Sequence, residues 1–134
     1  MKSLICAAVV TMLLVGCAGR QKTEVRTLRA PAGTSAVVSQ QLEEGNQLFK
    51  QQNWSGARQV YLATIQAEPT LAEAHYNLAL TLERLKEKAE ARKHYVEAAN
   101  LAPGNRVIWD APPLREYGNG TDFDKKSFMD AKPQ

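Results

Sequence analysis

Cysteine is nearly absent from this sequence. The 134 residues include two cysteines, Cys6 and Cys17, and both lie near the start of the chain. From residue 18 onward there is no thiol that could form a disulfide, ligate a metal or act as a nucleophile. Thiol redox chemistry is therefore excluded for that part of the chain.

Other signatures of catalysis are missing as well. The sequence has no glycine-rich phosphate loop and no nucleophile elbow. Its two histidines, His75 and His94, have no cysteine near them, and packing or solvent exposure explains both positions. We therefore predict that the chain is not an enzyme and holds no metal and no cofactor, apart from the covalent lipid considered below.

Charge of one sign is also scarce. The net charge is +3, and no basic run with interleaved aromatic residues occurs, so we predict no nucleic-acid partner. The composition, with 44% hydrophobic and 23% charged residues, is ordinary for a folded domain. The length leaves room for one small domain.

The sequence has one long apolar run, from Leu4 to Val15, interrupted only by Thr11 and preceded by Lys2. The run is too short to span a bilayer, and a charge followed by an apolar stretch is typical of a secretory signal. We therefore expect residues 1–16 to be a signal peptide that is not part of the fold.

The four residues Leu14-Val15-Gly16-Cys17 close this run. They resemble the bacterial lipobox, which implies that Cys17 carries lipid and begins the mature chain. Several acyl chains on one residue would anchor the protein firmly in a membrane. Ala18 follows, which in the best-known sorting rule for such lipoproteins implies the outer membrane, here with the protein facing the periplasm. The alternative is a plain signal peptide with an incidental cysteine.

Residues 17–35 have the composition of a flexible, basic linker. They contain few large apolar groups and only one acidic residue, Glu24, against Arg20, Lys22, Arg26 and Arg29. Such a tether could extend to at most ~60 Å. Its basic residues could also contact anionic lipid head groups, but a solvated linker is the simpler interpretation.

Four amphipathic segments follow, and their periodicity predicts helices at about 35–51, 55–67, 71–85 and 88–101. Asn53-Trp54-Ser55-Gly56 provides the first turn. The predicted fold class is therefore all-α.

The two halves of this helical region repeat each other with a period of 34 residues. The second copy contains Leu78-Ala79, Leu82, Ala91, Tyr95 and Pro103, and the first contains Glu44-Gly45, Leu48, Ala57, Tyr61 and Pro69. This pattern resembles the tetratricopeptide repeat (TPR). The resemblance implies two helix-turn-helix hairpins of a right-handed α-solenoid, at about 38–71 and 72–105.

The repeated residues have packing reasons of their own. Small residues such as Gly45 and Ala57 would let two helices approach to the ~8 to 10 Å typical of packed pairs. Tyr61 lies one turn after Ala57 on the same helix face and could fill the space beside the contact. Pro69 cannot continue a helix and would end the unit.

A third copy begins and fails. Residues 106–109 could start a fifth helix, but Ala111-Pro112-Pro113 breaks the pattern. Two repeats leave apolar surface open, because about three are normally needed to bury it. We expect the irregular segment 106–134 to act as a cap and tail, with Trp109 and Leu114 covering the last helix. Self-association or another protein could complete the stack instead.

The resemblance also implies a protein-binding groove along the first helix of each hairpin. Its residues would be Leu42, Asn46, Phe49, Lys50, Tyr76, Leu80, Glu83 and Arg84. Asn46 and Asn77 match two amide positions with which some family members clamp a peptide carboxylate. Leu42 replaces the first lysine of that clamp, so an amphipathic helix or an extended apolar segment is the better expected ligand. The apolar residues could equally pack against the chain's own tail or a neighbour.

Small repeat lipoproteins of this kind are similar to assembly and pilotin factors of bacterial pilus and secretion machines. The resemblance implies a lipid-anchored adaptor in the bacterial cell envelope that binds other envelope proteins or peptides. The alternative is a permanent structural subunit of an envelope or surface complex, with groove and tail buried in a fixed interface. Self-association is open in both cases.

Overall fold

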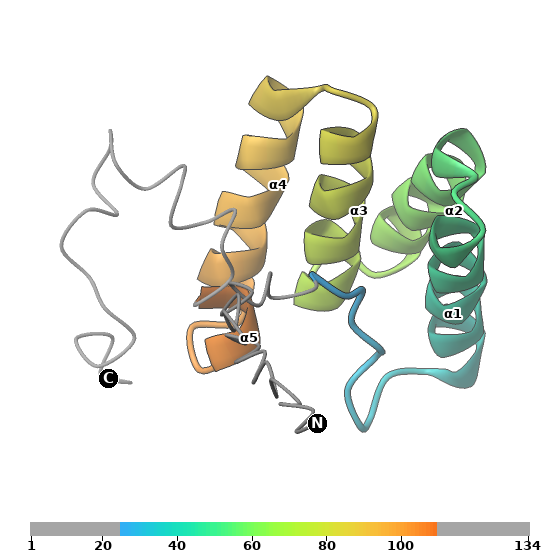
Figure 1. Cartoon of the computed structure of the whole chain (residues 1–134). Coiled ribbons are helices and arrows are strands. Elements are labelled where there is room, and N and C mark those ends of the chain that lie inside the picture. The colour runs from blue at the N-terminus through green and yellow to red at the C-terminus, as the bar shows by residue number, and fades with distance from the viewer. Residues whose placement is uncertain (1–24, 110–134) are drawn as a thin grey trace, which may run out of the picture.

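The computed structural model describes residues 25–109, and every helix there was expected from the periodicity. The helices are α1 (Ala36–Lys50), α2 (Trp54–Ala67), α3 (Ala72–Arg84), α4 (Lys88–Leu101) and the short α5 (Arg106–Trp109) (Figure 1). The predicted all-α fold is confirmed, and both bounds of each of the first four helices are correct to within one residue. The proposed signal peptide, Cys17, the start of the linker and residues 110–134 lie outside the described residues.

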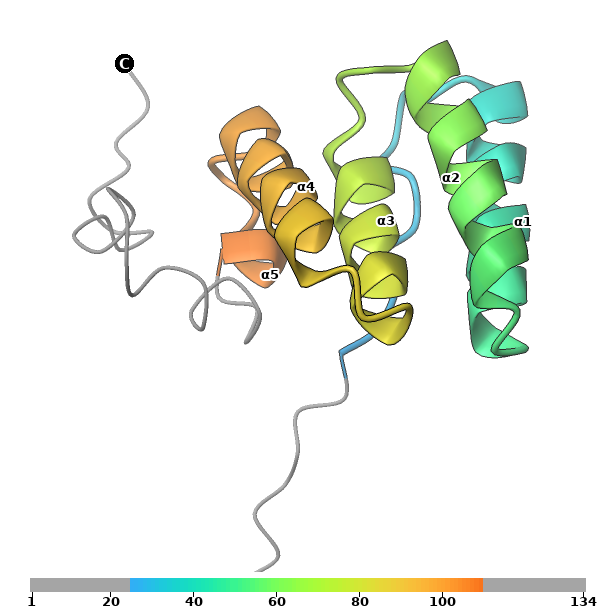
Figure 2. The same ribbon diagram turned by 90° about the horizontal axis from the view of Figure 1, so that it is seen from above.

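The helices form two consecutive hairpins, α1 with α2 and α3 with α4, and α2 also packs on α3 (Figure 2). Both hairpin turns have the same backbone geometry. Gln52 and Lys86 have positive φ angles of 62° and 68°, and they are 34 positions apart in the sequence. The repeat therefore extends to the turn conformation, which the residue types do not reveal.

Side-chain caps start the first two helices. The hydroxyl of Ser35 accepts a hydrogen bond from Val38 N–H, and the side chain of Asn53 accepts one from Gly56 N–H. Each cap satisfies an N–H group that has no partner within its own helix. Asn53 therefore fixes where the chain leaves the first turn.

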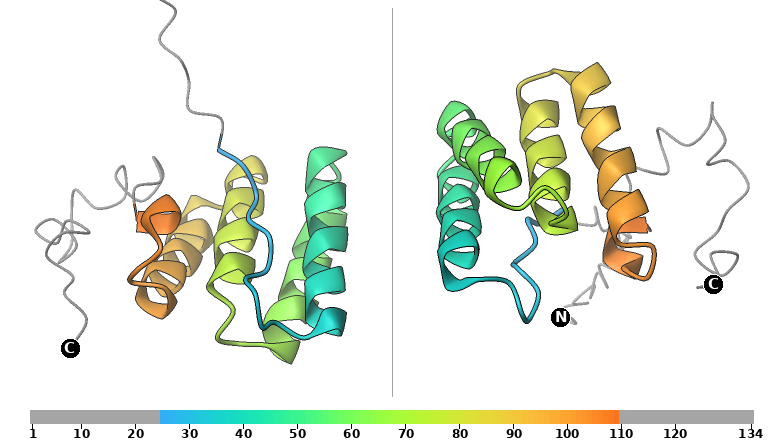
Figure 3. Two further views of the ribbon diagram at one scale, coloured as in Figure 1. Left: turned by 90° about the horizontal axis from the view of Figure 1, so that it is seen from below. Right: turned by 180° about the vertical axis from the view of Figure 1, so that it is seen from behind.

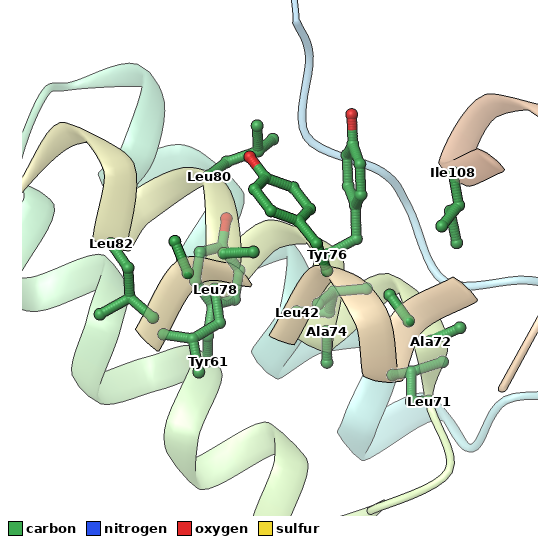
Figure 4. Packing of buried hydrophobic residues seen from close by; sticks show 14 of the residues in the cluster. Leu42, Tyr61, Leu71, Ala72, Ala74, Tyr76, Leu78, Leu80, Leu82 and Ile108 are labelled. Atoms are coloured by element: carbon green, nitrogen blue, oxygen red, sulfur yellow. The ribbon is translucent and has the colours of Figure 1, made fainter. Parts of the chain in front are cut away.

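Helix α3 lies at the centre of the fold, and every residue from 71 to 82 is buried. The largest fully buried side chains come from all five helices and include Tyr61, Tyr95, Leu42, Leu78, Leu82 and Ile108. All of these except Tyr95 are labelled in Figure 4. Because α2 and α4 flank α3, one continuous core joins the two hairpins.

The small residues of the repeat lie where the packing argument requires them. Ala57, Ala79 and Ala91 are 0% exposed, and Gly45 is buried. A Cβ atom on residue 45 would lie 2.7 Å from Cδ1 of Tyr61 and closer still to Cε1. The aromatic ring of α2 thus occupies the space that a side chain on α1 would need.

The short helix α5 packs on α4 at the end of the second hairpin. Ile108 of α5 is 0% exposed and belongs to the core, and Trp109 packs against it half-buried. The side chain of Asn105 accepts hydrogen bonds from Val107 N–H and Ile108 N–H, which starts this turn. The capping prediction is thus correct for Trp109, while Ile108 is the more deeply buried residue and Leu114 lies outside the described residues.

The prediction of a solvated linker is wrong for residues 25–30, whereas residues 31–33 are exposed. Residues 25–34 run alongside α3 and α1 before the chain enters α1 (Figure 3). Val25, Leu28 and Ala30 pack half-buried against the core. The segment is held because its backbone meets polar side chains of the helices, as described below.

We predict that Gly45→Ala lowers the free energy of unfolding by about 1–2 kcal/mol, since overpacking against Tyr61 outweighs the better helix propensity of alanine. Urea unfolding followed by circular dichroism measures the change. Gly104→Ala is the matched control, because a Cβ there meets nothing within 4 Å. Equal stability of the two variants would contradict the packing explanation.

Candidate functional site

The candidate site lies on the surfaces of α1 and α3 that carry Asn46 and Asn77, which we call the inner face. The backbone of Leu28 lies against it. Leu28 N–H donates to Oδ1 of Asn77 at 2.7 Å, and Nδ2 of Asn77 donates back to the Leu28 carbonyl at 2.8 Å. Nδ2 of Asn46 donates to the same carbonyl at 3.0 Å. Two amide side chains therefore bind both polar groups of one residue's backbone.

A second layer of hydrogen bonds fixes the orientation of these amides. Oδ1 of Asn46 accepts from the Tyr61 hydroxyl at 2.8 Å and from Nδ2 of Asn77 at 2.9 Å. Because both of these donors reach the oxygen of Asn46, its Nδ2 group is left to face Leu28. Burial raises the pKa of Tyr61 far above its usual range, with a smaller contribution from Glu43, so the hydroxyl remains a donor.

The apolar side chains that were expected to line the groove are almost completely buried. Leu42, Tyr76 and Leu80 are only 0%, 2% and 4% exposed. The ring of Tyr76, labelled in Figure 4, meets that of Tyr95 edge to face, with centroids 5.7 Å apart. Burial, with a smaller effect of Glu83, raises the pKa of Tyr76 to about 12. These three predicted groove residues are therefore part of the core.

One ion pair lies at the rim of the site, and its carboxylate, Glu43 Oε2, also accepts a hydrogen bond from Nδ2 of Asn46 at 3.5 Å. Nε of Arg29 lies 4.0 Å from Oε2 of Glu43, and the two side chains are 86% and 45% exposed. A contact this long and this exposed contributes little to stability. The contact does place the carboxylate of Glu43 beside Arg29, the residue that directly follows Leu28.

Two other predicted groove residues, Phe49 and Arg84, lie around Trp54. Phe49 packs edge to face on Trp54, with ring centroids 4.9 Å apart, and the guanidinium of Arg84 lies 5.8 Å from the Trp54 centroid. Lys50 is exposed. Oε2 of Glu83 accepts a hydrogen bond from the Tyr95 hydroxyl. The eight residues predicted as one groove therefore do not share one surface.

The histidines of α3 and α4 contact each other. Nε2 of His75 lies 3.0 Å from the carbonyl of Pro69, which can only accept, so Nε2 donates. In neutral His75, Nδ1 then accepts from Nδ1–H of His94 at 3.1 Å. Within residues 25–109 no group of three or more His, Cys, Asp or Glu side chains is arranged to hold a metal ion. The pair links the two helices of the second hairpin.

Stability should depend on the protonation of His94. Burial, and secondly the nearby His75, lowers the pKa of His94 below its ordinary 6.5. The unfolded chain then binds a proton more readily, so the free energy of unfolding should fall as the pH drops below about 6.5. Urea unfolding at pH 7.5 and 5.5 measures the difference. The variant His94→Gln should show a smaller loss, and an unchanged loss would contradict this origin.

The comparisons with known proteins agree with the repeat pattern. Residues 45–86 match the family described as TPR repeat, and residues 72–105 match the family described as tetratricopeptide repeat. No curated protein and no solved structure matches the chain. The chain therefore contains tetratricopeptide repeats. Such repeats generally mediate protein–protein interactions, and proteins built from them are typically scaffolds without enzymatic activity.

Sequence reasoning placed Asn77 only at an amide position of a carboxylate clamp, and it did not identify the bound segment. In the structure Asn77 forms more hydrogen bonds to Leu28 than Asn46 does. No sequence pattern indicated that residues 25–30 would be bound. Their backbone forms the hydrogen bonds, and any residue except proline supplies the same backbone groups.

Proposed function

We propose that this chain is a protein-binding adaptor whose inner face binds an extended polypeptide segment. The supporting observation is the seating of Leu28, whose N–H and carbonyl both hydrogen-bond to Asn77. Asn77 and Asn46 reach main-chain atoms of the segment, so a partner's backbone offers the same groups. Backbone hydrogen bonds supply affinity in this mode of recognition, and side-chain contacts supply specificity.

The geometry favours an extended segment over the amphipathic helix also considered. In a helix, interior N–H and carbonyl groups already bond to each other, so they could not bond to Asn77 and Asn46. An extended partner needs only one free peptide group and a modest apolar contact.

We further propose that the adaptor works in the bacterial cell envelope, anchored by lipid on Cys17 to the outer membrane and facing the periplasm. The resemblance of residues 14–17 to a lipobox supports this location. Among the described helices, none is long and apolar enough to cross a membrane. The partner class that follows is another envelope protein, for example a component of a pilus or secretion assembly.

Site-specific photocrosslinking in cells tests the adaptor function. A photoreactive amino acid replaces Glu43, which lies at the rim beside Arg29. We expect an adduct between this variant and a second protein, identified by mass spectrometry. The matched control places the same amino acid at Leu62, an exposed position of α2. Absence of an adduct from residue 43, or an equal adduct from residue 62, would contradict binding at the inner face.

The anchor is tested separately by Cys17→Ser. We expect the wild-type chain to sediment with membranes and to incorporate labelled fatty acid, because several acyl chains hold a protein far more firmly than one. The serine variant should lose the label. If the wild-type chain takes up no label, the lipid anchor is wrong, whereas the binding function stands.

A further inference from the structure

The inner face already holds a peptide, namely residues 25–30 of the same chain. We propose that this segment is an intramolecular ligand and that a partner's extended segment binds by displacing it. This inference rests on the proposed function, since it concerns the regulation of the same face. The partner then competes with a segment tethered directly to α1, instead of entering an open groove.

The segment is held less deeply than the helices hold each other. Its apolar side chains, Val25, Leu28 and Ala30, remain half-buried, and Arg26 and Arg29 are exposed. In contrast, Leu42, Tyr61 and Leu82 of the helices are 0–1% exposed. Segments with exposed backbone and few buried apolar contacts are the ones that open locally while the fold persists. Release of residues 25–30 is therefore a smaller step than unfolding of a hairpin.

Release would leave the receiving groups in place. The hydrogen bonds from Tyr61 and Asn77 to Oδ1 of Asn46 lie within the helices and do not involve the segment. After release, Oδ1 of Asn77 and Nδ2 of Asn46 would still face the position that the backbone of Leu28 had occupied. The inner face is thus prearranged for a replacement backbone, which lowers the entropic cost of binding.

The sequence of the bound segment indicates the chemistry of the partner. A competing segment should be extended, carry an apolar side chain at the position of Leu28, and place a basic residue next to it, where Arg29 meets Glu43. Proline at the position of Leu28 should be excluded, because its nitrogen has no hydrogen to donate to Asn77.

Displacement would also change the reach of the domain from the membrane. With residues 25–30 seated, the segment between the proposed anchor Cys17 and Val25 spans at most ~30 Å when fully extended. With the segment released, the chain up to α1 spans at most ~60 Å. Partner binding would therefore allow the repeats to move further from the anchor.

The test uses the mature chain from residue 17 to 134, with Cys17→Ser for solubility. The probe is a fluorescent synthetic peptide with the sequence of residues 23–33, added in trans and followed by anisotropy. Leu28→Pro in the protein removes the backbone N–H group that donates a hydrogen bond to Oδ1 of Asn77. We expect this variant to bind the peptide ~10-fold more tightly than wild type, because affinity scales with the fraction of open sites.

Two controls accompany this variant. Ala32→Pro lies in the turn closed by the hydrogen bond from Thr34 N–H to the Pro31 carbonyl, where proline at the second position is favoured, so it should bind as wild type does. A peptide with proline at the position of Leu28 should not bind. If Leu28→Pro fails to fold by circular dichroism, Leu28→Gly replaces it, and loss of the half-buried side chain that packs against the core should raise peptide affinity severalfold.

The outcomes separate the two proposals. Equal, measurable binding of the peptide by wild type and by the released variant would overturn intramolecular competition and leave the binding function intact. No binding to a variant whose residues 25–30 exchange amide hydrogens freely would overturn both. A wild-type chain that sediments as a dimer, with residues 25–30 crosslinked to a second copy, would overturn the intramolecular assignment.

Discussion

The organisation of the site depends on one side chain, the carboxamide of Asn77, which binds the N–H and the carbonyl of Leu28 at once. An amide can do this because it presents a donor and an acceptor side by side, as a neighbouring strand does in a sheet. A carboxylate or an alkyl group of similar size offers only half of this pattern or none. Asn77 therefore lets a helical surface hold an extended backbone.

The position of that amide follows from helix packing. The ring of Tyr61 fills the space left by Gly45, and its hydroxyl then reaches Oδ1 of Asn46, to which Nδ2 of Asn77 also donates. The absence of a side chain on α1 thus permits a contact with α2 that orients a polar group toward α3. Packing of the repeats and chemistry of the face are connected through these few atoms, so a change at Gly45 would affect both.

Sequence reasoning succeeded where side-chain periodicity determines structure. The 34-residue spacing of Tyr61 and Tyr95, together with the small residues around them, predicted both hairpins. It failed for residues 25–30, whose basic, aperiodic composition is that of a linker. The interactions that hold this segment use backbone groups, which every residue type except proline provides. Sequence reasoning also assigned Tyr76 and Leu80 to a groove surface, whereas both lie in the core.

The central claim is that Leu28 is seated on the inner face in solution. The most direct measurement is the hydrogen-exchange rate of the Leu28 amide in the full chain, followed by NMR and compared with the same residue in a free peptide of residues 23–33. We predict slower exchange in the chain, and loss of this protection in Asn77→Ala, because the acceptor at 2.7 Å is removed. Exchange of Leu28 at the free-peptide rate in the folded wild-type chain would contradict the account.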